Sequence, residues 1–358
     1  MYNLLKDWNN MINFENCEIT NIVIHNIGNK FEGGILNISD SCFVPEDTDI
    51  MNLLKTHFLY AFKKDAYYNF EPYENEYLNN TIYYSANMIF KDQAFFYEYS
   101  IEIAKHLFEQ SNNPNIKSGE LYIVHFSNCL IDDGLCDAVG IFKSENKDTF
   151  LKIINTQNSY QLIGEQGINI KKLDKACIIF NTNADMGYKV SVIDKTNTKE
   201  AVYWVENFLG LTPSNDSYFQ TQNYLDLCKN FIKEVYNQEN EVNRADQIDM
   251  LNRSINFFKD SDVFSENKFK EEIVKEPEVI DAFEQYKSQY SSDNNIEFPT
   301  EFGVSNYAVN DEKRYFKHVL KLDKNFHVYI HGERKYIQKG YDSEKDMNYY
   351  KLYFRNEE

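Results

Sequence analysis

Residues 119–194 contain five short strand-like segments with no helical stretch between them, and this succession limits the possible folds more than any other feature. The segments are GELYIVHF (119–126), CDAVGIFKS (136–144), TFLKII (149–154), ACIIFNT (176–182) and GYKVSVID (187–194). DDG, GEQG and NAD lie in the breaks, and these residue types favour turns. Consecutive strands without intervening helices are typical of an antiparallel meander.

Helical patterns flank this stretch. Residues 46–64 and 91–110 repeat apolar positions at helical spacing, whereas residues 19–28 alternate as a strand does. Further helices are expected at residues 199–210, 217–236, 245–259 and 276–290. Near the C-terminus the alternation returns at residues 315–322, 326–331 and 347–354, and a loop with Gly340 precedes the last of these.

We therefore predict an α+β fold. Its parts are an N-terminal mixed α/β region with the antiparallel meander, a helical middle and a C-terminal antiparallel β segment. The expected domains are residues 1–197, the helical region 198–292, and residues 293–358, which combine a linker with a basic β segment. The linker is inferred from residues 291–312, which are polar and rich in turn-forming types.

Basic residues gather near the C-terminus of a chain whose net charge is −19. Residues 311–358 have a balance of +2, which leaves −21 for the rest of the chain. Residues 313–340 contain only two acids, Asp323 and Glu333, against eight cations. The candidate phosphate-binding residues are these eight: Lys313, Arg314, Lys317, Lys321, Lys324, Arg334, Lys335 and Lys339.

Alternation within residues 315–322 separates two faces of the expected strand. Lys317, Val319 and Lys321 share one side, and mostly apolar residues lie on the other. In one interpretation the lysines form a solvated outer face that protects an edge strand from aggregation. In the other they form a patch that binds phosphates. The sequence leaves both open, and the spatial distribution of the cations has to decide.

The histidines give little support for catalysis. His25, His57, His106 and His125 lie within apolar strands or helices, where a hydrogen-bonded structural histidine is more common than a catalytic base. His327 and His331 are four residues apart, but no cysteine or carboxylate is suitably spaced to complete a metal site with them. We expect these two to face solvent or to belong to the basic patch.

Other motifs of catalysis and cofactor binding are not recognisable. Asp132 and Asp133 precede Gly134 and indicate a hairpin turn, with a divalent-ion site as the less favoured alternative. Neither a nucleophile elbow nor a glycine-rich phosphate loop is present. We therefore predict no enzyme activity, no cofactor and no metal.

The composition predicts a cytoplasmic protein. No apolar run approaches the roughly 18 residues that a membrane helix needs, and the N-terminal residues do not resemble a secretory signal. The six cysteines form no CxxC pair and lie mostly beside apolar residues, as buried thiols do in a reducing compartment.

Several stretches, in order along nearly the whole chain, resemble the bacterial nucleoid-associated proteins of the NdpA/YejK type. They are IVIHNIGNKFEGGILNISD, SGELYIVHF, VGIFKSENKDTFLKI, LDKACIIFNT, YWVENFLG with TQNYLDLCKNF, RADQIDMLNRSINFFK, VLKLDKNFHVYIHGERKYIQKGYD and MNYYKLYF. The resemblance implies a non-enzymatic, nucleoid-localised cytoplasmic protein that is a homodimer. It also implies contact with DNA or with DNA-handling enzymes such as type II topoisomerases. It supplies no catalytic residues.

Two hypotheses about function follow from the charge distribution. In the first, the basic C-terminal segment contacts the phosphates of double-stranded DNA, while the acidic remainder repels DNA and fixes the docking face. In the second, the protein is an acidic interaction module that binds a basic partner, such as a topoisomerase tail, without direct DNA contact. A metal-dependent nuclease is a third, less favoured alternative, because no ligand cluster is visible.

Overall fold

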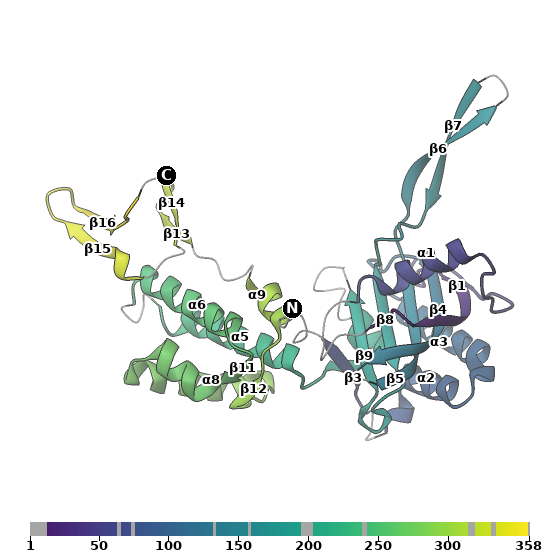
Figure 1. The fold of residues 1–358 in the computed structure, drawn as a ribbon, viewed down its shortest axis with the longest axis horizontal. Helices are drawn as coiled ribbons and strands as arrows, with labels where there is room; N and C mark the ends of the chain where they lie inside the picture. The colour runs from purple at the N-terminus through teal and green to yellow at the C-terminus, as the bar shows by residue number, and fades with distance from the viewer. Residues whose placement is uncertain are drawn as a thin grey trace, which may run out of the picture. The chain divides into compact units, whose positions relative to one another are not determined.

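The computed structural model describes residues 13–62, 66–72, 76–131, 134–156, 159–194, 203–237, 242–313, 319–330 and 334–356 (Figure 1). The chain divides into two compact units, Met1–Ser214 and Asn215–Glu358, and each is described by itself. The predicted α+β class is confirmed. The C-terminal β segment and most of the predicted helical region lie in the second unit, but the helix expected at residues 199–210 falls in the first. The separation of the helical region and the β segment into two domains stays a prediction.

An eight-stranded antiparallel sheet forms the centre of the first unit, in the order β10-β3-β9-β8-β5-β4-β1-β2. The strands are β1 (Glu18–Ile27), β2 (Leu36–Asn37), β3 (Tyr67–Phe70), β4 (Gly119–Ile131), β5 (Gly134–Ser144), β8 (Lys175–Phe180), β9 (Lys189–Asp194) and β10 (Leu211–Pro213). The neighbours β4, β5, β8 and β9 are four of the five strands predicted for the meander.

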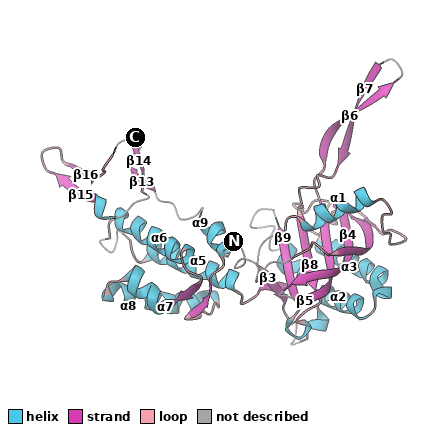
Figure 2. Cartoon of the chain, viewed as in Figure 1, coloured by secondary structure: helices cyan, strands magenta, loops and turns pink. Residues whose placement is uncertain are grey.

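Alternating side chains supply a core on each face of this sheet. On one face, Phe58 of α1 (Thr48–Leu59) packs with Tyr122 and Phe142. On the other face, α2 (Thr81–Lys91), α3 (Phe96–Gln110) and the π-helical segment Tyr203–Leu209 pack with strand residues such as Ile123 and Ile141. The first unit is therefore a three-layer structure, with helices on both sides of the sheet (Figure 2).

Helix α2 was not predicted from the sequence. Its aromatic and polar residues give a weak periodic pattern, but Asn80 caps it firmly by accepting hydrogen bonds from the backbone N–H groups of Ile82 and Tyr83. The helix predicted at residues 91–110 begins later, at Phe96.

The remaining predicted strand, residues 149–154, does not belong to the large sheet. It becomes β6 (Asp148–Thr156), which pairs with β7 (Ser159–Gly167) in a separate two-stranded ribbon. This ribbon projects from the body of the first unit (Figure 1). The prediction of a turn at GEQG was wrong, because Gly164 and Gly167 lie within β7 and pair with β6.

The second unit is built around an aromatic core. Its helices are α5 (Ser217–Glu234), α6 (Arg244–Lys259), α7 (Glu266–Phe269), α8 (Pro277–Asn294) and α9 (Asn306–Lys313), and β11 (Val263–Ser265) pairs with β12 (Glu301–Gly303). Tyr224, Phe264 and Phe302 meet in its centre. The prediction of a linker at residues 291–312 was wrong, because this stretch forms β12 and α9 and buries Phe302 and Val309.

Two separate hairpins follow α9. The first pairs β13 (Val319–Leu322) with β14 (Phe326–Tyr329), and the second pairs β15 (Ile337–Asp342) with β16 (Met347–Leu352). Gly340, expected in a loop, instead lies in β15 opposite Tyr349, whose ring fills the space where a Cβ would lie. In the described part of the chain, no helix is both long and apolar enough to span a bilayer.

Candidate nucleic-acid interface

Both C-terminal hairpins pack on helix α6. Ala245 and Ile248, one turn apart on α6, form a small buried cluster with Leu320, Ile330 and Ile337 from the hairpin region. This cluster is distinct from the main aromatic core of the second unit. The hairpins are therefore attached through their apolar residues, and the opposite faces are left to solvent.

Two polar contacts fix the hairpins to the same helix. The Asn252 amide donates a hydrogen bond from Nδ2 to the carbonyl oxygen of Ile330, 3.2 Å away. Arg334 forms an ion pair with Asp246 and also donates to the carbonyl oxygen of Ile337. Arg334, predicted to contact phosphate, is thus engaged by a carboxylate of α6 and holds the start of the second hairpin.

The outer face of the first hairpin carries a cation and aromatic rings. Lys321 lies directly opposite His327, and Val319 lies opposite Tyr329, so these four residues share one face. Lys321, His327 and Tyr329 are exposed, while Leu320 on the other face is buried. The predicted alternation is therefore confirmed for residues 319–322, and the exposed Lys324 occupies the turn.

Lysines and aromatic rings also alternate on the second hairpin. The Lys351 ammonium lies 5.3 Å from the centre of the Tyr349 ring, and that of Lys335 lies 5.1 Å from the Tyr336 ring. Lys339 is exposed on β15 opposite Tyr350, on the face that also carries the buried Ile337, whereas Lys351 and Tyr349 lie on the other face. Such interleaving of cations and rings is typical of surfaces that bind a phosphate backbone and stack on bases.

The tip of the second hairpin is acidic rather than basic. Asp342 pairs with Lys345 at 3.7 Å, and Asp346 accepts a hydrogen bond from the Tyr341 hydroxyl. Glu344 lies in the same turn. The positive part of this surface is thus confined to the first hairpin and the proximal half of the second.

The predicted cations lie on several elements. Lys313 ends α9 and lines a cavity of about 150 Å³ together with Lys259 of α6, which is not among the eight predicted cations. Both lysines occupy the last turn of a helix, where they also offset the negative helix terminus. Arg314 and Lys317 lie outside the described residues, as do His331, Asp132 and Asp133.

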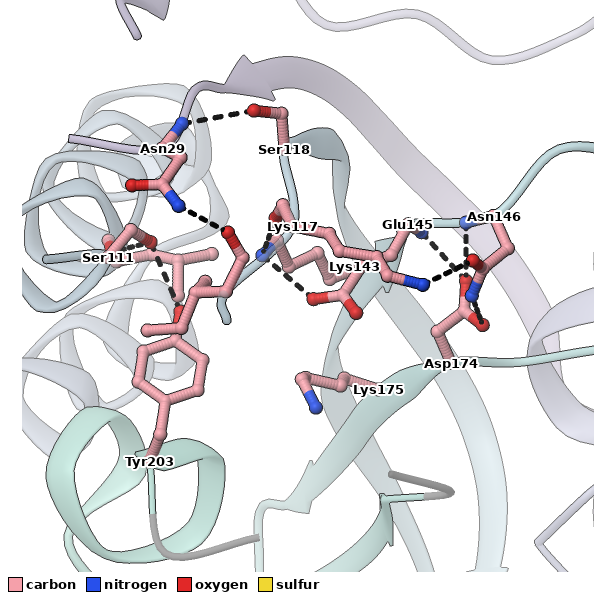
Figure 3. A network of polar contacts seen from close by, with 12 residues as sticks. Asn29, Ser111, Lys117, Ser118, Lys143, Glu145, Asn146, Asp174, Lys175 and Tyr203 are labelled. Carbon is pink, nitrogen blue, oxygen red and sulfur yellow. Dashed lines mark hydrogen bonds and ion pairs between the residues drawn. The ribbon is translucent and has the colours of Figure 1, made fainter. Parts of the chain in front are cut away.

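A second group of cations is buried in the first unit and cannot contact DNA (Figure 3). Lys143 is fully buried and donates to the carbonyl oxygen of Lys117 at 2.6 Å and to the Glu145 carboxylate at 2.9 Å. Lys175, its cross-strand neighbour, lies 3.2 Å from Asp194. Burial lowers the pKa of Lys143, and Glu145 opposes this shift. These contacts mark a structural network.

The four histidines expected to be structural all have hydrogen-bond partners. His57 and His106 contact the carbonyl oxygens of Ile170 and Phe208, and His125 contacts Thr20. Within the described residues, no group of three or more histidine, cysteine or acidic side chains is arranged to hold a metal ion.

His25 lies beside Ser100, but its tautomer rules out a serine nucleophile. Its Nδ1 accepts a hydrogen bond from the backbone N–H of Ser39, so the ring proton lies on Nε2, 3.2 Å from the Ser100 hydroxyl oxygen. A protonated Nε2 cannot take the hydroxyl proton, which is donated to the Tyr97 carbonyl instead.

The buried histidines make the stability of the first unit sensitive to acid. Burial lowers the pKa of His25 to about 4 from 6.5, so between these values the unfolded chain binds a proton that the folded chain does not. Stability should therefore fall as the pH decreases through this window, by roughly 3 kcal/mol from His25 alone. Burial lowers the pKa of His57, His106 and His125 as well, which adds in the same direction.

Urea unfolding between pH 7 and pH 4 measures this effect. His25→Gln should flatten the dependence of the unfolding free energy on pH. Equal pH slopes for wild type and His25→Gln would contradict the assignment.

A family model, NA37, described as nucleoid-associated protein YejK, matches residues 23–351. The match runs from within β1 into β16 and so includes both units and both hairpins. A search of curated proteins gives no match.

Proposed function

The chain belongs to the YejK family of nucleoid-associated proteins, and from this premise we propose that its C-terminal hairpins contact the phosphates of double-stranded DNA. The observation that supports this most directly is the outer face of the first hairpin, where Lys321 and Tyr329 are exposed while the opposite face is anchored on α6. Lys313, Lys324, Lys335 and Lys339 extend the contact surface, together with Arg314 and Lys317. Arg334 positions this surface, because its ion pair with Asp246 holds the second hairpin on α6.

The negative charge of the rest of the chain favours this surface as the place where DNA docks. With −21 outside residues 311–358, most of the molecule repels a polyanion, and DNA approaches where the local balance is positive. Phosphate contacts of this kind position a protein on the duplex and read little sequence. We propose a non-catalytic role in the cytoplasmic nucleoid, in which a homodimer presents two such surfaces and bridges two DNA segments.

Fluorescence anisotropy with a short labelled duplex at several salt concentrations tests the proposal. If about five cations neutralise phosphates, log affinity should fall with log salt at a slope near −4.5. Failure to bind duplex DNA at low salt, or an affinity that does not change with salt, would overturn it.

A second candidate function, binding of a basic protein partner, is favoured by a pocket in the second unit. The pocket has a volume of about 740 Å³ and lies where the C-terminal end of α5 meets the N-terminal ends of α6 and α8. Phe231, Val235 and Val279 give it an apolar lining, and Glu276 and Glu278 add carboxylates. A pocket that combines acidic groups with some apolar side chains suits a lysine or arginine flanked by apolar residues.

Tyr236 also lines this pocket, and the direction of its pKa shift agrees with an acidic pocket lining. Burial raises the pKa of the Tyr236 hydroxyl, and the charges of Asp246 and Glu276 raise it further. Arg253 acts in the opposite direction but is paired with Asp249 at 2.8 Å. Four carboxylates and one arginine line the pocket, so its lining is acidic even though Asp246 is also paired with Arg334.

Pull-down from nuclease-treated lysate separates the two candidates. A type II topoisomerase or another DNA-handling enzyme retained after nuclease treatment, and released by Glu276→Lys with Glu278→Lys, would favour the acidic pocket. Partners that disappear with the DNA would favour the hairpins. Retention by both the wild type and the Lys variant would show that this pocket is not the contact.

A further inference from the structure

The β6–β7 ribbon of the first unit has two chemically different faces. Residues directly opposite each other share a face, so the register places Leu151 with Gly164 and Ile153 with Leu162. The other face carries Lys152 and Glu165, whose charged groups pair at 3.3 Å, together with Phe150, Ile154 and Ile163. We call the first of these the apolar face. Its residues are Thr149, Leu151, Ile153, Asn155, Tyr160, Leu162, Gly164 and Gln166.

The apolar face has no charge and is largely open to solvent. Its four large side chains are exposed by 71% for Leu151, 66% for Ile153, 74% for Tyr160 and 64% for Leu162. Exposed apolar groups that scatter singly are ordinary, but four adjoining ones on a projecting ribbon indicate an interaction surface. An isolated two-stranded hairpin is only marginally stable in water, so a covering partner would also stabilise the ribbon.

Side-chain contacts at its base anchor the ribbon to the first unit. Asp148 accepts a hydrogen bond from Asn169 at 2.8 Å and pairs with Lys172 at 3.0 Å. Beyond this point the ribbon extends away from the sheet (Figure 1). The apolar face is therefore presented at a distance from the acidic body of its own unit.

We propose that the apolar face binds the same face of a second copy of this chain. The charge distribution favours this occupant over others. Two chains of net charge −19 repel each other, and an uncharged face lets them meet without placing like charges in contact. DNA or an anionic membrane would need cations on this face, and a basic partner would need carboxylates. The face offers neither.

The shape of the face is also compatible with pairing to itself. A Cβ added to Gly164 would meet no atom within 4 Å, so this position is a dent beside Leu151. A two-fold axis along the ribbon places Leu151 of each copy against Gly164 of the other. The same axis places Ile153 against Leu162, so one operation buries all four of these positions in each copy.

The size of the contact predicts a reversible dimer. Burial of three aliphatic side chains and one tyrosine on each copy corresponds to on the order of 1,000 Å² for the pair. This lies near the lower limit for a specific interface, so we expect a dissociation constant in the micromolar range.

Sedimentation velocity of the full chain over about 1–100 μM tests the inference with matched variants. Ile153→Thr with Leu162→Thr changes the apolar face, and Ile154→Thr with Ile163→Thr makes the equivalent change on the opposite face. We expect the first pair to raise the dissociation constant at least about tenfold and the second to leave it nearly unchanged. All the exchanged residues lie outside the large sheet, so circular dichroism should report an intact core.

Gly164→Val distinguishes specific packing from nonspecific adhesion. Valine favours a strand and adds apolar surface, so a merely adhesive face would associate more strongly. If Leu151 of the partner occupies the dent, valine fills it and weakens the dimer instead.

A wild-type chain that is monomeric throughout the range, or equal weakening by both threonine pairs, would overturn the inference. Because it rests on the dimeric part of the proposed function and not on DNA contact, DNA anisotropy on the same samples separates the two. Loss of dimer with retained DNA affinity per chain would leave the DNA proposal intact.

Discussion

Glu145→Gln should lower the free energy of unfolding of the first unit by about 3–5 kcal/mol. Lys143 is fully buried, and Glu145 is the carboxylate that balances its charge at 2.9 Å. Glutamine preserves the shape of the side chain but leaves Lys143 charged in an apolar environment or forces it to lose its proton. Urea unfolding monitored by circular dichroism measures the change.

The exposed pair Lys152–Glu165 offers a matched control. Its carboxylate also lies 3.3 Å from a lysine, but the two side chains are 55% and 40% exposed, so Glu165→Gln should change stability by less than about 1 kcal/mol. Comparable losses for the two glutamine variants would contradict the distinction between buried and exposed pairs.

The pH dependence of the unfolding free energy is a second test of the prediction for Glu145→Gln. Because burial lowers the pKa of Lys143 below its unfolded value, the folded chain loses this proton first as the pH rises. Between the folded and unfolded pKa values the unfolded chain binds more protons, so stability due to this residue rises with pH. The defect of Glu145→Gln should therefore shrink as the solution becomes more alkaline.

Charge reversal on the hairpins should have the largest effect on DNA binding. Lys321→Glu, Lys324→Glu and Lys339→Glu together would remove three phosphate contacts and place carboxylates on the docking face. Each contact contributes about 0.9 to the salt slope, so the slope should become shallower by about 2.7. The affinity at moderate salt should fall at least about a hundredfold.

The control for this triple variant is a charge reversal of the same size elsewhere in the second unit. Lys233, Lys268 and Lys275 are exposed and lie outside the hairpins, so their replacement by glutamate changes the net charge equally. It should have a much smaller effect, limited to long-range repulsion. Equal losses from the two triple variants would mean that total charge, rather than the hairpin surface, governs binding.

Sequence patterns predicted the fold correctly where an element is determined by residues that are close together in the chain. Strand-like segments predicted β1, β4, β5, β8 and β9 of the large sheet, whereas the short strands β2, β3 and β10 were not predicted. The helix expected at residues 245–259 corresponds to α6. The errors occurred where tertiary packing overrides composition. The polar stretch 291–312 was taken for a linker, although two of its residues, Phe302 and Val309, complete a core assembled from distant helices. Glycine at 164 and 167 suggested a turn, but strand pairing with β6 determines the structure there.

The candidate interface was only partly predictable for a similar reason. Composition located the cations, and alternation assigned Lys321 to an exposed face. No local pattern could indicate that Arg334 pairs with Asp246, which is 88 positions away, or that Lys259 lines a cavity with Lys313. The tertiary fold determines which cations form ion pairs within the protein and which remain accessible to a ligand.

The way the ribbon joins the first unit makes it separable from the rest of the fold. Asp148 and Gly167 lie opposite each other at its base, and the chain leaves β5 and returns to β8, two strands that are already neighbours. A tight turn between these two positions would close the backbone without disturbing any pairing within the large sheet. Gain, loss or variation in length of this arm is therefore open to a lineage of such proteins, whose mode of assembly can change while the domain that carries the arm stays the same.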